Sequence, residues 1–298
     1  MIRTKTKKIA ETMQVDLILT ADWHLRETNP VCRLDNFCEE TQWRKVKFIT
    51  DLQKQYDCPV IHAGDLFDYW KPSPYLLSKT IEYLPKQFYT VYGNHDLPQH
   101  NIELAEKSGV YTLEKANKVE TTGRISLELR HWEEVPQFDD DSKILIWHIF
   151  TYQGKEPFPG CTSLTAKKLL KKYPQYDLIV TGDNHQSFVE EYENRLLVNP
   201  GSIFRMDANQ INHKPKIYLY YASTNSVKPI YIPIEESVIS REHIDIVKER
   251  DDRINAFITQ LNDNWQVGLS FEENIKQFEQ RNQIRKSVME IIHKAIEL

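Results

Sequence analysis

The chain contains six short apolar stretches, and each of them runs into polar residues. The stretches are rich in β-branched and aromatic residues and are bounded by Gly, Pro, Asn or Asp, which is typical of buried strands. We therefore expect six strands, listed here with the residues that follow each: Val15–Thr20 before Asp22-Trp23-His24, Pro59–Ala63 before Gly64-Asp65, Phe88–Tyr92 before Gly93-Asn94-His95-Asp96, Ile144–Trp147 before His148, Leu178–Thr181 before Gly182-Asp183-Asn184-His185, and Leu196–Val198 before Asn199-Pro200-Gly201-Ser202.

Segments with apolar residues three or four positions apart lie between these strands and predict helices. In the first 110 residues strand and helix alternate, and a further strand, helix and strand follow later. The expected helices are Phe37–Tyr56, Tyr75–Leu84, Asn101–Lys107 (stopped by Gly109) and Ser163–Tyr173.

From Lys118 to Leu129 apolar and polar residues alternate, which suits antiparallel strands. Further short β runs occur at Phe188–Tyr192, Lys216–Tyr221 and Pro229–Ile234. The sequence therefore predicts an α/β (α+β) fold, in which a sandwich of mixed parallel and antiparallel strands carries helices on its outer faces.

Beyond Glu235 the pattern becomes helical, over Ser240–Leu261 and Phe271–Leu298, with a break around Gln266-Val267-Gly268. We therefore expect a main domain over residues 1–234 and a helical C-terminal region over residues 235–298. The second helix has a single apolar stripe. That stripe either packs against the main domain or docks onto the helices of a partner.

Composition limits the class of protein. A chain of 298 residues can bury a large core without disulfides, and its four cysteines have no metal-ligand or redox spacing. The basic N-terminus lacks the apolar core of a signal peptide, and no apolar run approaches the ~20 residues of a membrane span. We expect a cytoplasmic protein without a membrane partner. The net charge of −5 argues against a wholly basic surface.

Four of the nine glycines fall inside the strand-exit motifs: Gly64, Gly93, Gly182 and Gly201. Glycine permits positive φ and close approach of the backbone. This clustering predicts tight turns that deliver the neighbouring side chains to one centre. In sheet-based α/β folds, ligands collect outside the carboxyl ends of the strands.

The strand exits carry oxygen and nitrogen donors. Asp22 and His24 lie two positions apart, and Asp183 and His185 repeat that spacing, while Asp65, Asn94 and His148 follow other strands. Mixed donors of this kind suit Mn²⁺, with Mg²⁺ or Fe as alternatives. They exceed the needs of one ion, so we expect two ions about 3.5–4 Å apart with a shared carboxylate. The sixth exit, from Asn199 to Ser202, is expected to be a supporting loop.

Two divalent ions and a bridging water point to phosphoester hydrolysis. The ions would activate the water and neutralise charge on the phosphoryl oxygens, while a nearby imidazole protonates the leaving oxygen. Such a reaction needs no serine or cysteine nucleophile, and the chain contains no GxSxG motif.

The motifs DxH, GD, GNHD, a lone His and GxxH follow one another in this order, and the chain thereby resembles the calcineurin-like metallophosphoesterase superfamily. Two longer runs are more specific: Ala63-Gly64-Asp65-Leu66-Phe67-Asp68 with Pro72-Ser73-Pro74 downstream, and Gly93-Asn94-His95-Asp96-Leu97-Pro98. These runs resemble the SbcD-type DNA repair nucleases, including shortened phage-encoded forms. The resemblance implies a metallophosphoesterase-type β-sandwich with a C-terminal helical appendage.

The resemblance also implies roles for individual residues. One ion would be held by Asp22, His24, His185 and the bridging Asp65, and the second by Asp65, Asn94, His148 and Asp183. His95 matches the catalytic histidine, and Asp96 would fix its tautomer. The family usually has histidine where this chain has Asp183, so the resemblance does not by itself make Asp183 a ligand.

The implied activity is that of a Mn²⁺-dependent DNA exonuclease or endonuclease in repair, recombination or end processing. DNA, an SbcC-like ATPase and a second copy of the chain are the implied partners. The C-terminal helices would serve as a reduced cap, an ATPase-docking element, or both. Candidate DNA contacts are Arg26 and Arg33 in the long segment after His24, and Lys167 and Lys171 on a basic helix face.

Two other functions remain open at this stage. The first is a phosphoesterase of the same fold that acts on nucleotides or lipid-linked diphosphates. The second is a non-catalytic scaffold, although a degenerate scaffold would be expected to lose ligands that this chain retains.

Overall fold

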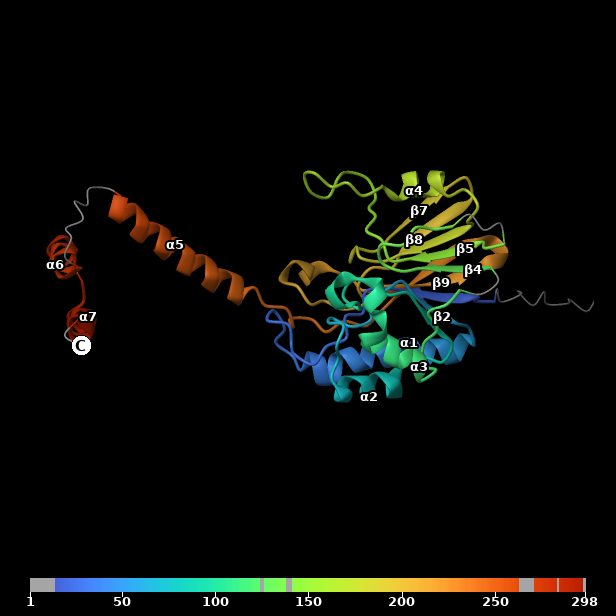
Figure 1. Cartoon of the computed structure of the whole chain (residues 1–298), viewed down its shortest axis with the longest axis horizontal. Helices are drawn as coiled ribbons and strands as arrows, with labels where there is room; N and C mark the ends of the chain where they lie inside the picture. Colours follow the sequence, from blue (N-terminus) through green and yellow to red (C-terminus); the bar gives the residue numbers. More distant parts are fainter. Residues whose placement is uncertain (1–13, 124–125, 138–140, 263–270, 283, 297–298) are drawn as a thin grey trace, which may run out of the picture. The chain divides into compact units, whose positions relative to one another are not determined.

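The structure is a computed structural model that describes residues 14–123, 126–137, 141–262, 271–282 and 284–296 (Figure 1). The chain divides into two compact units, Met1–Arg241 and Glu242–Leu298, which are described separately.

The first sheet of the larger unit has the strand order β10-β9-β1-β2-β3. Strands β1 (Leu17–Thr20), β2 (Val60–His62) and β3 (Phe88–Thr90) are parallel neighbours. Strand β9 (Lys216–Tyr221) pairs antiparallel with β1, and β10 (Ser226–Tyr231) forms the edge beside it. Because β1, β2 and β3 run in the same direction, the residues that follow them emerge at one edge of the sheet.

The second sheet has the order β4-β5-β6-β8-β7. Strands β4 (Leu127–Arg130), β5 (Ile144–Trp147), β6 (Leu178–Thr181) and β8 (Arg195–Asn199) are parallel. Strand β7 (Phe188–Tyr192) pairs antiparallel with β8 at the edge. The residues after β5 and β6 therefore also emerge together.

The two sheets pack face to face, as Figure 1 shows for the larger unit. Leu19 and Ile61 of the first sheet share a buried cluster with Ile146, Val180 and Val198 of the second. This apolar layer excludes water from between the sheets and fixes how the strand ends of one sheet lie against those of the other.

Helices cover both outer faces of the sandwich. Helices α1 (Gln42–Tyr56), α2 (Pro74–Tyr83) and α3 (Gly109–Lys115) pack on the first sheet, and α4 (Ala166–Lys172) packs on the second. The predicted β-sandwich with outer helices is confirmed. Local signals agree with it: the Ser73 hydroxyl accepts a hydrogen bond from the Leu76 amide at the start of α2, and Pro74 occupies the first turn.

The prediction of antiparallel strands over Lys118–Leu129 was wrong. Only Leu127–Arg130 forms a strand among the described residues of this region, and it pairs parallel with β5. Alternating apolar residues indicate that one face of a strand meets the core, as Leu129 does in the edge strand β4, although Glu128 on the opposite face is also buried. The alternation contains no information about the direction of the neighbouring strand.

The helix expected over Asn101–Lys107 is a 3₁₀ helix over Ile102–Lys107, and Gly109 does not stop it. Gly109 instead opens α3, where the Ser108 hydroxyl accepts a hydrogen bond from the Tyr111 amide. A Cβ at Gly109 would lie 2.3 Å from Cγ of Pro72. Close packing against Pro72 therefore explains a glycine at this position. The strand expected over Pro229–Ile234 lies earlier, at β10.

The smaller unit contains α5 (Glu242–Asn262), α6 (Phe271–Arg281) and α7 (Lys286–Ile296). The single helix expected over Phe271–Leu298 is thus divided in two; His293 of α7 pairs with Glu279 of α6 at 2.7 Å. The apolar spacing continues across the division, and periodicity alone merged the two helices. The break expected around residues 266–268 lies outside the described residues. Among the described residues, no helix is both long and apolar enough to cross a bilayer.

Residues 238–240, which precede α5 in the sequence, are hydrogen-bonded to the loop after His24. The Leu34 amide donates to the Val238 carbonyl at 3.0 Å, and the Ser240 amide donates to the Cys32 carbonyl at 2.8 Å. Close by, Arg33 pairs with Asp35 and donates to the Arg205 carbonyl. The loop between His24 and α1 is therefore a fixed part of the larger unit.

The buried Lys45 of α1 predicts an unusual pH dependence of stability. Burial lowers the pKa of Lys45 to about 8, with further lowering by Arg33 and Arg205 against the attraction of Glu235. Between about pH 8 and the unperturbed value of 10.5, the unfolded chain binds more protons, so this residue makes stability rise with pH. We expect Lys45→Met to stabilise the protein at pH 7 by up to about 3 kcal/mol, with a gain that shrinks towards pH 10.

Urea unfolding at pH 7 and pH 9.5 measures this difference. Lys47→Met is the matched control, because Lys47 lies on the same helix in an exposed ion pair with Asp51 and should change stability by less than about 0.5 kcal/mol. A Lys45→Met gain that does not depend on pH would contradict the account.

Candidate active site

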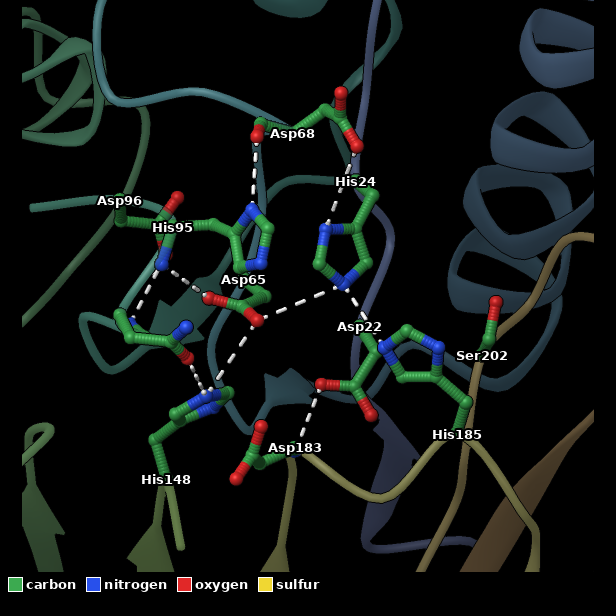
Figure 2. A network of polar contacts seen from close by, with 12 residues as sticks. Asp22, His24, Asp65, Asp68, His95, Asp96, His148, Asp183, His185 and Ser202 are labelled. Carbon is green, nitrogen blue, oxygen red and sulfur yellow. Dashed lines mark hydrogen bonds and ion pairs between the residues drawn. The ribbon is translucent and has the colours of Figure 1, made fainter. Parts of the chain in front are cut away.

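The polar residues that follow five strands meet at one place between the two sheets (Figure 2). The first sheet contributes residues after β1, β2 and β3, and the second sheet contributes residues after β5 and β6. The predicted ligands and the predicted acid that gather there are Asp22, His24, Asp65, Asn94, His95, His148, Asp183 and His185.

The chain turns sharply at several of these residues. Asp22, His24, Asp65 and Asp183 all have positive φ, at 51°, 46°, 58° and 72°. Residues other than glycine rarely adopt a positive φ, although aspartate tolerates it better than most residues. Such backbone strain is found preferentially at functional sites. The four turns redirect these side chains towards a common centre at the strand ends.

Two glycines allow the loops to approach closely. A Cβ at Gly64 would lie 2.3 Å from Nδ1 of His148, and a Cβ at Gly93 would lie 2.1 Å from Oδ1 of Asp65. Neither distance is compatible with a side chain. These glycines are therefore required for His148 and Asp65 to occupy their positions.

One group of donors lies around His24. Its Nε2 atom is 3.1 Å from Nε2 of His185 and 3.5 Å from Oδ2 of Asp65. Donor atoms of Asp22, His24 and His185 all lie within 4.8 Å of one another. This spacing allows the three side chains to bind one ion, and Asp65 stands beside them.

A second group lies around His148. Its Nε2 atom is 3.1 Å from Oδ1 of Asn94 and 3.6 Å from Oδ2 of Asp65. Its Nδ1 atom is 2.7 Å from the carbonyl oxygen of Ala63, which can only accept a hydrogen bond. Nδ1 therefore carries the proton, and the Nε2 lone pair faces Asn94 and Asp65, as required of a metal ligand.

The electrostatics of the centre favour the binding of a cation. Burial raises the pKa of Asp22 and Asp65, and burial lowers the pKa of His24 and His185. Oδ2 of Asp22 is buried and has no hydrogen-bond partner. A buried carboxylate oxygen without a hydrogen-bond partner costs free energy. A cation that binds this oxygen and the neighbouring neutral imidazoles removes that cost. The residues present therefore fit divalent metal ions.

His95 differs from the predicted ligands in being exposed. Its Nδ1 atom is 2.9 Å from the backbone carbonyl oxygen of Asp68, and its backbone amide donates to Oδ1 of Asp65 at 3.0 Å. The Asp68 carbonyl thus fixes the proton on Nδ1 and leaves Nε2 as the nitrogen free to exchange a proton.

The prediction that Asp96 fixes the tautomer of His95 was wrong. The buried Asp96 carboxylate accepts hydrogen bonds from three backbone amides, those of Leu66, Phe67 and Gly93, at 3.0–3.2 Å. Asp96 therefore joins the loop after β2 to the loop after β3. It positions Asp65 and His95 through the backbone, and its side chain does not set the tautomer of His95.

Asp183 stands at the edge of the two donor groups. Its backbone amide donates to Oδ1 of Asp22 at 2.9 Å, so Asp22 retains only Oδ2 for a metal ion. Figure 2 shows the Asp183 side chain beside Asp22, extending towards His148. Its charge raises the pKa of both Asp22 and Asp65, which places the carboxylate within electrostatic reach of the centre.

The four predicted substrate contacts fall in different places. Arg26 reaches Asp68 at 3.5 Å and so lies beside His24 and His95. The Arg33 side chain is 1% exposed and is held by Asp35, which gives no support to a substrate contact. Lys167 and Lys171 are exposed on α4, where both lie over the Tyr192 ring.

The sequence prediction missed two neighbours of the centre. Asp68 follows Asp65 by three residues and was quoted only as part of a motif. Trp132 follows β4, and its ring centroid lies 5.9 Å from that of His148. Trp132 follows the end of a seventh strand, and this position could have identified it. The sequence analysis instead predicted a longer antiparallel region there and did not recognise the end of β4. The sixth exit has the expected supporting geometry: the Asn199 amide group donates to the carbonyls of Asn184 and Gln186, on either side of His185.

A family of protein sequences described as the calcineurin-like phosphoesterase superfamily domain matches residues 15–219 of this chain. The match covers all of the strand exits described above. A search of curated proteins finds no match.

Solved structures with a similar fold include a novel archaeal phosphodiesterase (16% identity, 72% of this chain and 98% of that one, TM-score 0.39). TT1561 of Thermus thermophilus is 12% identical over 74% of this chain and 100% of its own, with a TM-score of 0.42. A putative 5′-nucleotidase from Staphylococcus aureus is 13% identical over 79% and 58%, with a TM-score of 0.42.

The contacts of Asp96 predict the effect of replacing it. Asp96→Asn would present an amide N–H₂ group to backbone N–H donors, so we expect a loss of about 2–4 kcal/mol in stability and weaker metal binding. Thermal unfolding and metal titration measure both. A variant of normal stability and metal affinity that lost only turnover would instead place Asp96 in the reaction.

Proposed function

Because the chain belongs to the calcineurin-like phosphoesterase superfamily, and is thus identified as a metallophosphoesterase-type phosphoesterase, we propose that it is a two-metal phosphodiesterase that cleaves DNA, as an SbcD-type nuclease does. The observation that carries the phosphodiesterase part is the position of Asp65. Its carboxylate lies between two groups of ligands, and the exposed His95 stands beside it.

Asp22, His24, His185 and Asp65 would hold one ion, and Asp65, Asn94, His148 and Asp183 the second, with Mn²⁺ preferred. When bound, the two ions would supply an activated water and neutralise charge on the phosphoryl group. The buried side chains keep competing water away from the ions. The turns at Asp22, His24 and Asp65 hold the ligands in place before the substrate arrives.

His95 would protonate the leaving oxygen. Its Nδ1–H donates to the Asp68 carbonyl, so the ring is oriented, and in the imidazolium form the proton on Nε2 is the one that would pass to the leaving oxygen. His95 also lies close to the first group of ligands, with donor atoms of His24, Asp65 and His95 within 4.8 Å of one another. An acid at this position would lie next to the phosphoester bond of a substrate bound to the ions.

Two observations support a DNA substrate. A cavity of about 280 Å³ beside Asp68 is lined by Arg26, Lys71 and Tyr69. Tyr69 is 59% exposed. Cationic groups and exposed aromatic rings are the usual contacts of single-stranded nucleic acid. The cavity is also lined by Glu27 and Asp68, whose carboxylates would repel phosphate. Phosphate contacts are therefore expected only beside Arg26 and Lys71.

The partner proposal concerns the smaller unit. Helix α5 exposes Ile246, Val247, Ile254 and Ile258, whose exposed fractions range from 46% to 60%. Apolar side chains along one exposed helix are typical of a surface that binds another helix. We therefore keep an SbcC-like ATPase as the proposed partner, with a second copy of the chain as the alternative.

Cleavage assays with Mn²⁺ separate the candidate functions. Wild-type protein would be incubated with labelled single-stranded and double-stranded DNA, with and without an SbcC-type ATPase, and with bis-p-nitrophenyl phosphate. The proposal expects cleavage of DNA and of the generic diester. Hydrolysis of the diester without any DNA cleavage would favour a small-molecule phosphoesterase, and inactivity on both with metal bound would favour a scaffold.

Replacing His95 tests the proposed acid. His95→Ala should retain metal stoichiometry and lose at least about 100-fold in turnover, because general acid catalysis contributes factors of this order. Metal analysis and DNA cleavage measure the two effects. His100→Ala, which removes another exposed histidine nearby in sequence, should leave both unchanged. Retained turnover in His95→Ala would remove this residue from the mechanism.

A further inference from the structure

Residues 151–165, between β5 and α4, form an arm whose two ends are held together. The Ala166 amide donates to the Tyr152 carbonyl at 2.9 Å, and the Thr151 hydroxyl donates to the Leu164 carbonyl at 2.9 Å. Every residue from 153 to 160 is exposed, and Figure 1 shows the arm extending beyond the ends of the strands. Long surface loops with closed ends are often functional, and no step of the proposed hydrolysis uses this one.

The arm starts beside the candidate metal centre. His148 lies three residues before Thr151, and the Thr151 carbonyl accepts a hydrogen bond from the Asn184 side-chain amide at 2.8 Å. Asn184 lies between Asp183 and His185 in the loop after β6. The base of the arm is therefore fixed to both loops that the second sheet contributes to the centre.

Phe158 is the one large apolar side chain among the exposed residues 153–160, and it is 53% exposed. Its ring contacts the Phe150 ring, with centroids 6.1 Å apart. Phe150 lies two residues after His148. Because two residues span at most about 7 Å, the Phe158 ring lies within roughly 20 Å of the His148 backbone. One bound polymer can therefore contact both the centre and Phe158.

The backbone around Phe158 is restrained. Pro157 and Pro159 flank it and limit the conformations of this stretch. Gly154 and Gly160 have positive φ, at 79° and 82°, and a Cβ at either would meet no atom within 4 Å. These glycines thus form the turns of the arm and are not required by close packing. An exposed ring on a restrained backbone loses little conformational entropy when it binds.

A cavity of about 350 Å³ opens at the base of the arm, and Lys167 of α4 is the cationic residue among those that line it. The Lys167 ammonium lies over the Tyr192 ring at 5.7 Å. Glu190 also lines the cavity, and its carboxylate accepts a hydrogen bond from the Gln153 amide at 2.7 Å. Because Gln153 engages this carboxylate, a phosphate group near Lys167 meets a weaker repulsion than a free carboxylate would produce.

We propose that the arm and Lys167 bind a single strand of nucleic acid that leads to the metal centre, with Phe158 stacked on an unpaired base and Lys167 in contact with a phosphate. This inference rests on the proposed cleavage of DNA and names single-stranded DNA as the preferred substrate. Within a duplex both faces of a base are covered, so an exposed ring stacks on unpaired bases. A docked protein would need a continuous apolar patch, whereas Phe158 stands among polar residues, glycines and prolines.

DNA binding at the arm is measurable apart from turnover. A labelled single-stranded oligonucleotide, and the same sequence as a duplex, would be titrated with His95→Ala protein and Mn²⁺ and followed by fluorescence anisotropy. The single strand should bind more tightly than the duplex. Adding Phe158→Ala should weaken single-strand binding by at least about fivefold, because one base loses its stacking partner, and should leave duplex binding unchanged.

Matched variants identify the contacts. Phe158→Tyr keeps an aromatic ring and should keep the affinity of the parent, whereas Tyr231→Ala removes a ring of similar exposure (58%) from β10 and should change neither affinity. Lys167→Ala should lower the slope of log affinity against log salt by about 0.7, the contribution of one phosphate contact on a single strand. Lys168→Ala, next to it on α4 and outside the cavity, should change the slope less. Unfolding curves identify any variant that fails to fold.

Kinetics with His95 intact give a second measurement. Phe158→Ala should raise KM for single-stranded DNA and leave hydrolysis of bis-p-nitrophenyl phosphate unchanged, because this small diester cannot span the distance from the centre to the arm.

Two results would overturn the proposal: a folded Phe158→Ala variant with the single-strand affinity of its parent, or a parent that binds the duplex as tightly as the single strand. DNA that binds through Phe158 and stays intact with the wild-type protein would contradict the nuclease proposal and leave this one standing. Cleavage of DNA by a Phe158→Ala variant with unchanged affinity would do the reverse.

Discussion

Oδ2 of Asp65 lies 3.5 Å from His24 and 3.6 Å from His148, and these two histidines follow strands of different sheets. The Asp65 side chain is 2% exposed, and burial raises the pKa of its carboxyl, so its charged form needs compensation by positive charge. The packing of the sheets, the left-handed turns and the close approach at Gly93 all converge on this contact. Both groups of candidate ligands depend on it.

The centre contains both buried and exposed residues, and the two kinds differ in what they can contact. Asp22, Asp65 and His148 are almost completely buried, which strengthens their attraction to a cation and keeps water from competing for it. His95 is exposed and held by a single backbone carbonyl, so a long substrate can reach it. Under the proposed function, His95 would act as the proton donor, and its exposure would suit a polymeric diester whose leaving group remains outside the protein.

Much of the fold, and the gathering of the candidate ligands at one place, was predictable, because a parallel strand places the next few residues at the edge of its sheet. The apolar runs before Asp22, Asp65 and His148 therefore located the centre without knowledge of sheet order. Contacts between loops were not predictable in this way. Asp96 binds backbone amides of another loop, and the Asp68 carbonyl orients His95, because of how two turns pack. Alternation over residues 118–129 likewise did not reveal which strand would be the neighbour.

The central claim is that two ions share the Asp65 carboxylate, and anomalous diffraction from crystals soaked in Mn²⁺ tests it most directly. The account predicts two anomalous peaks, one between Asp65 and His24 and the other between Asp65 and His148. A single peak at full Mn²⁺ saturation, or peaks that do not flank the Asp65 carboxylate, would contradict it.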